Sequence, residues 1–302
     1  MPRHLLPVVA IVATLATPFL GEPQAHAAPA VKPAAAVLTE QQAILPADGP
    51  YVVKLQNVRG PVLVRGWNKN VVYVKAEKRA THPLSGTEAT LWGEAAVTID
   101  RPEPGQVVAT TRFPSQAKAL PSVVASKTSH IEVAYTVMLP PEAALELSQE
   151  AGNVTVVGVD GRLQVTTRDG AIAVAQAKGR VEASTERGDI RLKDIQGDAV
   201  IQTLHGQVYA DAVTGDLQAK TSTGDVWVTV PPRYAADVSF QTVRGVFRSD
   251  LATFQTDMNA GETGYVGILR GPLALNGAPD FRVVVDTVSG TLQIAGDRTS
   301  NR

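Results

Sequence analysis

The sequence predicts an all-β chain folded as a parallel β-solenoid, in which each coil contains 18 residues and two short strands. Two periodicities in the middle of the chain carry this prediction. Glycine occurs nine times in succession at a spacing of nine residues, from Gly152 to Gly224. Threonine recurs every eighteen residues, at Thr167, Thr185, Thr203 and Thr221. Self-similarity at a fixed period is the sequence signature of a repeat fold.

Each nine-residue unit of the regular repeat region, residues 152–232, is expected to form one strand. The second and fourth residues after each glycine are apolar or small, as Ile190 and Leu192 are, and the residues between them are mostly polar, as Arg191 is. Alternation with a period of two places one face of a strand in the core. The glycine that begins each unit supplies the backbone freedom that a corner needs.

The threonines define the length of a coil. Each one begins a Thr-x-x-Gly motif, and these motifs close on Gly170, Gly188, Gly206 and Gly224. The motif returns at residues 242–245 and 287–290, and residues 57–60 are an imperfect copy. Two kinds of corner therefore alternate at eighteen residues, which an antiparallel meander, the rival fold, does not require.

Stacked coils place residues i and i+18 side by side, about 4.8 Å apart as in any sheet. Opposite charges support this register at three pairs of positions: Arg168 with Glu186, Asp169 with Arg187, and Arg180 with Asp198.

The chain on either side of the repeats is expected to extend the solenoid as part of one domain, residues 50–302. Strands are expected at 51–56, 61–65, 71–77, 95–99, 106–113 and 130–139, with an inserted loop at 114–129. A Gly-rich excursion at 261–277 is expected to fold over one flank or to protrude as a hairpin. Because a solenoid needs its ends covered, the irregular N-terminal strands and residues 292–296 are the predicted caps.

The N-terminus predicts export to the periplasm, the cell surface or the medium. Residues 1–27 resemble a signal peptide, with a basic start, an interrupted apolar stretch and a small-x-small site ending at Ala27. The alternative is an uncleaved anchor helix. Residues 28–49 are rich in Ala and Pro and predict a linker, with a short helix around 37–44 as an option. The mature chain has no expected transmembrane segment.

Composition excludes several classes of function. The chain contains no cysteine, so disulfides, thiolate nucleophiles and cysteine metal sites are absent. The 28 basic and 29 acidic residues nearly cancel without a long run of one sign, which argues against nucleic acid as a partner.

Several segments together resemble a bacterial β-strand-repeat domain family of unknown function that is labelled "putative adhesin". These segments are residues 53–67, the strand that ends at Leu139-Pro140, the glycine repeats, and the closing residues 286–290. The resemblance covers about residues 50–296 and implies the solenoid fold. It implies no functional residues, and a fold alone does not define a function.

We find no catalytic, cofactor-binding or metal-binding residues in the sequence. A glycosidase needs two carboxylates at a defined separation, but Asp189, Asp198, Asp216 and Asp225 all directly follow a repeat glycine and are expected to be turn residues. The units also lack the second glycine of calcium-binding nonapeptides. The outward faces of the regular coils offer one carboxylate each, Glu182 and Asp211.

One pair of aromatic residues is a candidate binding surface. Tyr209 and Trp227 are eighteen residues apart at an outward position, so their rings should stack, with Arg191 and Lys193 nearby. Exposed aromatic pairs suit a glycan or a protein partner, unless the excursion or the N-terminal strands cover them. The threonine column shares the parity of the inward residues and is expected to be a buried ladder.

These observations favour a non-enzymatic envelope or cell-surface protein, a binding scaffold that resembles an adhesin and has an unknown ligand. A carbohydrate-active β-helix enzyme, either a lyase or a hydrolase, is one alternative. A self-assembling structural module of the envelope is the other.

Overall fold

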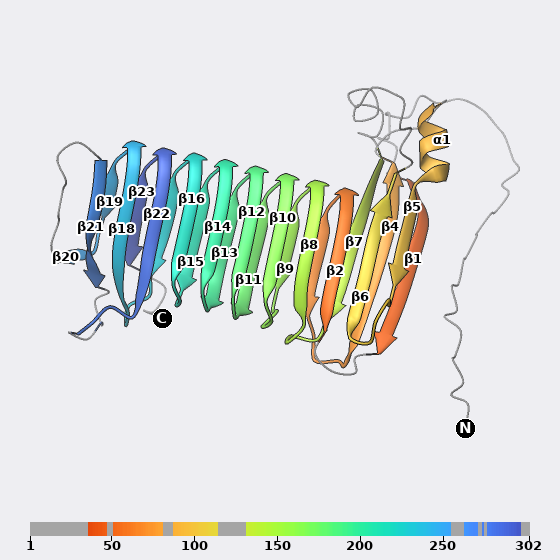
Figure 1. The fold of residues 1–302 in the computed structure, drawn as a ribbon, viewed down its shortest axis with the longest axis horizontal. Coiled ribbons are helices and arrows are strands. Elements are labelled where there is room, and N and C mark those ends of the chain that lie inside the picture. Colours follow the sequence, from red (N-terminus) through yellow and green to blue (C-terminus); the bar gives the residue numbers. More distant parts are fainter. Residues whose placement is uncertain are drawn as a thin grey trace, which may run out of the picture.

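The computed structural model describes residues 36–46, 51–80, 87–113, 131–254, 263–270, 274 and 277–296. Within these residues the chain forms two large β-sheets and one helix, α1 (Thr87–Glu94). Figure 1 shows the strands standing side by side along the long axis of the molecule. Among the described residues, no helix is long and apolar enough to cross a membrane. The predicted signal peptide, 1–27, and the predicted loop at 114–129 lie outside this part of the chain.

The strands form two sheets, which we call sheet A and sheet B. Sheet A has eleven strands, in the spatial order β1 (Ala36–Pro46), β4 (Val71–Ala80), β7 (Ile131–Leu139), β3 (Val62–Gly66), β9 (Val154–Val157), β11 (Ile172–Lys178), β13 (Ile190–Gln196), β15 (Val208–Val213), β17 (Val226–Val230), β23 (Leu292–Gly296) and β19 (Phe247–Ser249). Sheet B has twelve strands, in the order β20 (Ala252–Phe254), β21 (Thr263–Arg270), β18 (Ala235–Arg244), β22 (Phe281–Ser289), β16 (Leu217–Thr223), β14 (Ala199–His205), β12 (Val181–Arg187), β10 (Leu163–Asp169), β8 (Ala144–Ala151), β2 (Val52–Arg59), β6 (Gln106–Arg112) and β5 (Ala96–Asp100).

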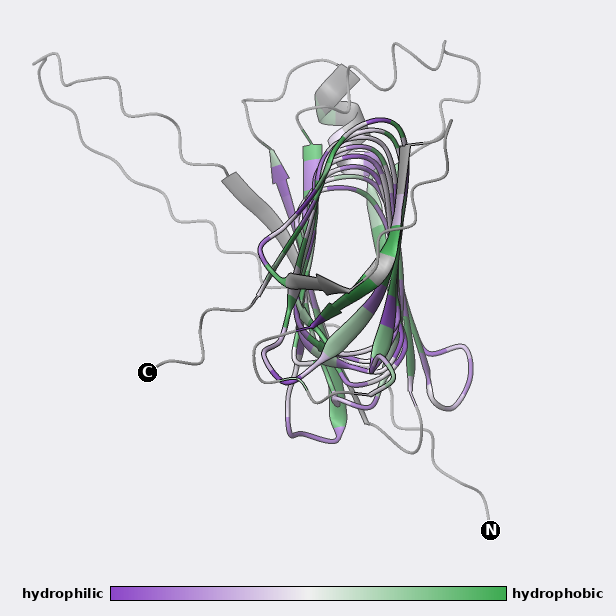
Figure 2. Cartoon of the chain, turned by 90° about the vertical axis from the view of Figure 1, so that its left-hand side faces the viewer, coloured by the Kyte–Doolittle hydropathy of each residue, from purple (hydrophilic) through white to green (hydrophobic). Residues whose placement is uncertain are grey.

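The predicted solenoid and its register are confirmed. Consecutive strands from β9 to β17 alternate between the two sheets, and each pairs in parallel with the strand eighteen residues away. Leu163 pairs with Val181 in sheet B, and Ile172 pairs with Ile190 in sheet A. Seen along the axis in Figure 2, the coils superimpose as a flattened oval in which the two sheets face each other.

The core is the space between the two sheets. The second and fourth residues after each repeat glycine point inward and are buried, as the alternation predicts, and they form one continuous apolar cluster along the axis. The predicted core residues are all buried: Ile172, Val174, Ile190, Leu192, Ile201, Val208 and Val226.

Glycine is required at the threonine corner because successive coils touch there through their backbones. A Cβ atom added to Gly206 would lie 2.0 Å from the carbonyl oxygen of Gly188, far inside van der Waals contact. The same approach, within 2.2 Å of the oxygen of the preceding glycine, recurs along the column at Gly152, Gly170, Gly188, Gly224, Gly290 and Gly245. Gly60 begins this column, so it contains eight glycines.

The opposite corner is made by a left-handed residue six positions after the glycine. Gly158, Gln176, Asp194 and Ala212 occupy this position in successive coils, and all have positive φ, +70° at Gly158 and +53° at the other three. Only glycine adopts this region without steric cost, so Gln176 and Ala212 hold a strained conformation that the stacked coils impose.

The spatial order of the coils departs from their order in the chain at both ends. The coil of β22 and β23 lies between the coil of β16 and β17 and that of β18 and β19. Residues 292–296 are therefore internal, and their prediction as a cap is wrong, because the chain first skips one rung and then returns to fill it. The end of the stack is instead formed by β18 to β21, where the rings of Phe247 and Tyr265 stack with centroids 3.8 Å apart.

At the other end, the N-terminal strands extend both sheets as predicted, at β2 to β7. Two elements were not anticipated, α1 and β8. The predicted linker 28–49 is wrong for residues 36–46, because these residues form β1, which pairs antiparallel with β4. No helix forms around 37–44. Sheet pairing with β4 overrides the weak local preference of this Ala-rich segment.

The excursion adds to sheet B rather than standing free. Its described part, β21, runs antiparallel to β18, with Phe240 opposite Tyr265, and β20 pairs with the other side of β21.

The glycine column generates a first prediction. Gly206→Ala should destabilise the protein by about 3 kcal/mol or more, because the added methyl group meets a carbonyl oxygen that its own strand ladder holds in place. Gly277→Ala is the matched control, since no heavy atom lies within 4 Å of its added Cβ. Denaturant unfolding measures both variants. Equal stability of the two would contradict the close approach of the coils.

The left-handed corner generates a second prediction. Ala212→Gly should stabilise the protein by about 0.5–1 kcal/mol, because relief of the left-handed strain exceeds the extra chain entropy of glycine. Ala175→Gly, in β11, is the control. It should destabilise the protein by about 0.5–1 kcal/mol, because Ala175 lies in an extended strand. The same sign of change in both variants would show that the corner is not strained.

Candidate functional site

The candidate site is a row of side chains on the outer face of sheet A. Arg191 in β13, Tyr209 in β15 and Trp227 in β17 are paired across neighbouring strands in the ladder. Each is the third residue after its repeat glycine and lies between two inward residues, so its side chain points away from the core. We call these three residues the aromatic ladder.

The predicted stacking of the two rings is confirmed. The centroids of Tyr209 and Trp227 are 4.7 Å apart and their planes differ by 6°. The guanidinium carbon of Arg191 lies 4.9 Å from the centroid of the Tyr209 ring, which is a cation–π contact. The spacing equals that of adjacent strands, so the sheet itself sets the distance between the rings.

Polar contacts hold the tip of each side chain of the aromatic ladder. The indole nitrogen of Trp227 donates a hydrogen bond to Gln293 Oε1 at 3.2 Å, and the Tyr209 hydroxyl donates one to Gln207. Arg191 Nη2 donates to Asp189 Oδ2 at 2.9 Å. Tyr209 therefore lies between Arg191 and Trp227, and one face of Trp227 is used in the stack.

Lys193 lies on the same face as Arg191 and is exposed. Its ladder partner is Asp211, whose carboxylate accepts a hydrogen bond from the hydroxyl of Thr229. Lys193 therefore adds a cation beside the aromatic ladder, and Asp211 is tied to its own sheet.

The aromatic ladder is half-exposed. The described part of the excursion pairs with β18 of sheet B, and the N-terminal strands lie beyond β9. Neither segment, within the described residues, forms the cover over Tyr209 and Trp227 that was the alternative interpretation.

The threonine column is buried, as predicted, and supports the corners. The hydroxyls of Thr185 and Thr203 donate to the carbonyl oxygens of Gly170 and Gly188, each at 3.2 Å, and Thr221 donates to Gly206 at 3.4 Å. Thr167 is buried as well. The hydroxyls of Thr185, Thr203 and Thr221 are therefore used within the fold.

The carboxylates of the coils have structural partners. Asp189, Asp198, Asp216 and Asp225 each accept a hydrogen bond from a backbone N–H in the next coil, those of Gln207, Asp216, Arg282 and Thr291, at 2.7–3.1 Å. These four carboxylates therefore link adjacent coils. The expected partner was instead the backbone of their own turn.

Glu182 and several residues of the predicted charge pairs form ion pairs on the surface of the coils. The Glu182 carboxylate accepts hydrogen bonds from Arg162 and Arg180, at 3.0 and 2.8 Å. The Asp169–Arg187 pair is confirmed, and its hydrogen bonds lower the pKa of Asp169. The other two predicted pairs form differently: Arg168 contacts Glu150 and Asp169, and Arg180 contacts Glu182 rather than Asp198. The described residues contain no cluster of three His, Asp or Glu side chains that could hold a metal ion.

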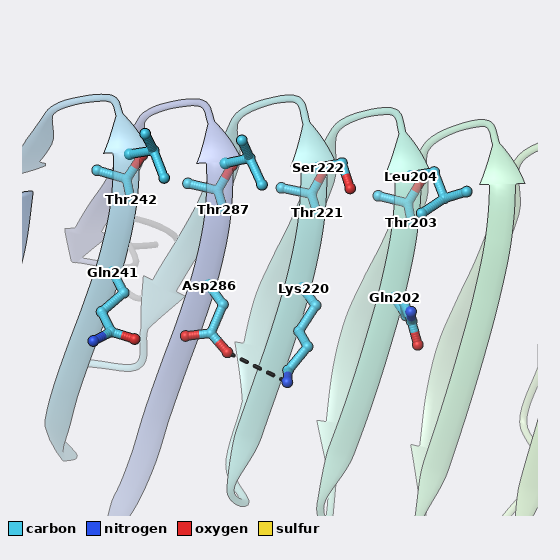
Figure 3. A pocket seen from close by; sticks show the side chains of 12 residues that line it. Gln202, Thr203, Leu204, Lys220, Thr221, Ser222, Gln241, Thr242, Asp286 and Thr287 are labelled. Atoms are coloured by element: carbon cyan, nitrogen blue, oxygen red, sulfur yellow. Dashed lines mark ion pairs between the residues drawn. The ribbon is translucent and has the colours of Figure 1, made fainter.

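Sequence reasoning missed a groove on the outer face of sheet B, with a volume of about 530 Å³. Figure 3 shows its lining from β14, β16, β22 and β18: a row with Gln202, Lys220, Asp286 and Gln241, and above it the threonines of the corner. Leu204, Ser222, Val288 and Val243 also line it. The available signal was that these last four residues each follow a threonine predicted to be buried.

Comparison with known proteins identifies relatives of the fold. Residues 142–295, just over half of the chain, match the family described as Toastrack DUF4097. No curated protein matches the sequence.

Two solved structures resemble the chain at low identity. One is a Clostridium sporogenes protein described as a "putative cell adhesion protein", with 12% identity and a TM-score of 0.41, covering 86% of this chain and 99% of its own. The other is a Bacteroides fragilis protein described as a "putative adhesin", with 10% identity and a TM-score of 0.43, covering 85% of this chain and 97% of its own.

The role of the aspartates generates a third prediction. Asp225→Ala should destabilise the protein by about 1–2 kcal/mol, because the N–H of Thr291 loses its acceptor at the junction with the inserted C-terminal coil. Asp225→Asn keeps an acceptor oxygen and is the matched control, with a loss below about 0.5 kcal/mol. Thermal melting of the two variants separates them. Indistinguishable melting would show that the link between the coils contributes nothing.

Proposed function

The chain belongs to the Toastrack DUF4097 family, and from this premise we propose that it is a non-enzymatic, exported binding scaffold of the cell envelope or cell surface. Its contact surface is the outer face of sheet A around the aromatic ladder. The observation that carries the proposal is the stacked and half-exposed row of Arg191, Tyr209 and Trp227 on a flat face of a rigid solenoid.

The residue types of the aromatic ladder are those that contribute most to binding energy at protein interfaces. Trp, Tyr and Arg are enriched among interface residues whose truncation costs more than about 2 kcal/mol. Here the stack and its hydrogen bonds order the three side chains before a partner arrives. Little rotamer entropy is then lost on binding, which favours affinity.

The orientation of the rings supports an envelope or surface protein as the partner more than a glycan. A sugar ring packs against a free aromatic face, whereas Tyr209 lies between Arg191 and Trp227 and one face of Trp227 stacks on Tyr209. The aromatic rings with Arg191 and Lys193 combine apolar and basic groups on one face of sheet A, which suits a protein surface with a complementary apolar and acidic patch.

Two further observations support the non-enzymatic part of the proposal. Glu182 and Asp211, the outward carboxylates of the regular coils, accept hydrogen bonds from Arg180 and Thr229, respectively. The aspartates of the corners connect coil to coil. The export part rests on the signal-type sequence of residues 1–27.

The proposal is tested by a binding screen of the purified chain, from which residues 1–27 have been removed, against envelope protein fractions and a glycan array. We expect saturable binding to a protein, weakened at least about tenfold by Trp227→Ala. Gln164→Ala, an exposed change on sheet B, is the control and should bind normally. Binding to glycans alone would replace the protein partner with a sugar, and binding that Trp227→Ala leaves intact would remove the aromatic ladder as the contact surface.

A further inference from the structure

The position directly after the threonine column forms a row of outward side chains, which we call the ridge. The residues at this position change from charged to mostly aliphatic halfway along the solenoid. In β8, β10 and β12 this position holds Glu150, Arg168 and Glu186, which are charged and exposed. In the next four strands of sheet B, β14, β16, β22 and β18, it holds Leu204, Ser222, Val288 and Val243. Leu204, Val288 and Val243 are 42%, 55% and 70% exposed. A row of exposed aliphatic side chains beside a groove is typical of an interaction surface.

The polar row on the other side of the groove has a self-complementary order. Across the four strands from β18 to β14 it consists of Gln241, Asp286, Lys220 and Gln202, an amide, an acid, a base and an amide. Lys220 Nζ lies 3.5 Å from Asp286 Oδ2, as the dashed line in Figure 3 marks, and both side chains are partly exposed. Exposed pairs of this kind exchange partners at little cost.

A second copy of the chain fits this order. A two-fold axis parallel to the strands, between β16 and β22, brings the two faces together with β16 of one copy over β22 of the other. Lys220 then faces the Asp286 position of the second copy, twice, and Gln202 faces the Gln241 position. By the same operation Leu204 meets the Val243 position, apolar on apolar. Such reciprocal contacts define the interface of a symmetric dimer.

We propose that the C-terminal half of the outer face of sheet B is a homodimer interface, formed by the ridge of Leu204, Val288 and Val243 and by the row of Lys220 and Asp286. The other half of the same face lacks the apolar ridge, because Glu150, Arg168 and Glu186 occupy the corresponding positions there and are exposed.

The size of the face sets the expected strength of the dimer. Four strands about 4.8 Å apart and about seven residues long cover roughly 450 Å² on each copy. The total of about 900 Å² is below the approximately 1,200–2,000 Å² of stable complexes, so the dimer should be weak, with a dissociation constant of about 10–100 μM.

Sedimentation equilibrium of the purified protein over about 1–500 μM tests the proposal, since this range brackets the expected constant. We expect the average mass to rise from monomer towards dimer. Lys220→Asp should raise the dissociation constant at least about tenfold, because it places acid against acid. The double change Lys220→Asp with Asp286→Lys recreates both pairs and should return the constant to within about threefold of the original.

Two further variants separate the interface from folding and from the proposed partner surface. Leu204→Asp should abolish the dimer while thermal melting stays unchanged, because Leu204 is already exposed in the monomer. Arg168→Gln, in the charged half, and Trp227→Ala, on sheet A, should leave the dimer intact. A monomer at every concentration, or a dimer that survives both Lys220→Asp and Leu204→Asp, would overturn the proposal. Loss of partner binding in Trp227→Ala tests only the aromatic ladder, so the two proposals can fail separately.

Discussion

Backbone contact at the glycine corner controls how the coils of this protein stack. Each glycine that follows Gly60 in this column lies against the carbonyl oxygen of the glycine in the preceding coil, at a distance that leaves no room for a side chain. At this corner, two coils can approach to the spacing of a β-sheet only where the residue that meets the carbonyl oxygen lacks a Cβ atom. The strict register of i with i+18 follows from this contact, because a shift by one residue would place a side chain at the corner and turn the inward face outward.

The surface chemistry of the molecule follows from the same register. Within the regular coils each strand residue lies beside one eighteen residues away, so each column becomes a ladder. Where the column holds aspartate, the carboxylate accepts a hydrogen bond from the backbone of the next coil. Where it holds Tyr209 and Trp227, the rings stack at the strand spacing. The scaffold thereby uses these acids to link adjacent coils and holds the aromatic side chains in a fixed arrangement.

The regular part of this structure could be predicted closely from the sequence, because its period encodes the contacts. Strand positions, the buried threonines and the stacking of Tyr209 on Trp227 all follow from counting to eighteen. The period is interrupted between Gly224 and Gly290, and nothing in a linear pattern shows that the later coil returns to lie between two earlier ones. Residues 36–46 carry little strand preference of their own and become β1 through pairing with β4. Alternation places Leu204, Ser222, Val288 and Val243 outward, because each follows a buried threonine, but the groove also needs β22 beside β16, and the linear pattern does not show that neighbour.

The two proposed surfaces lie on opposite sheets, and this arrangement has a consequence for binding. A dimer formed through sheet B would direct the two copies of sheet A outward, so that the aromatic ladders face away from each other. Two sites on a rigid body can engage two partner molecules held on separate surfaces, or one partner that is itself repeated. Linked binding of this kind raises the apparent affinity without any new contact at either site. A weak dimer with a modest affinity at each aromatic ladder can then bind its partner tightly, because the second binding step takes place within one complex. Linked binding requires a fixed geometry between the two faces of the solenoid. The backbone contacts at the glycine corner provide it, because each corner joins a strand of one sheet to a strand of the other.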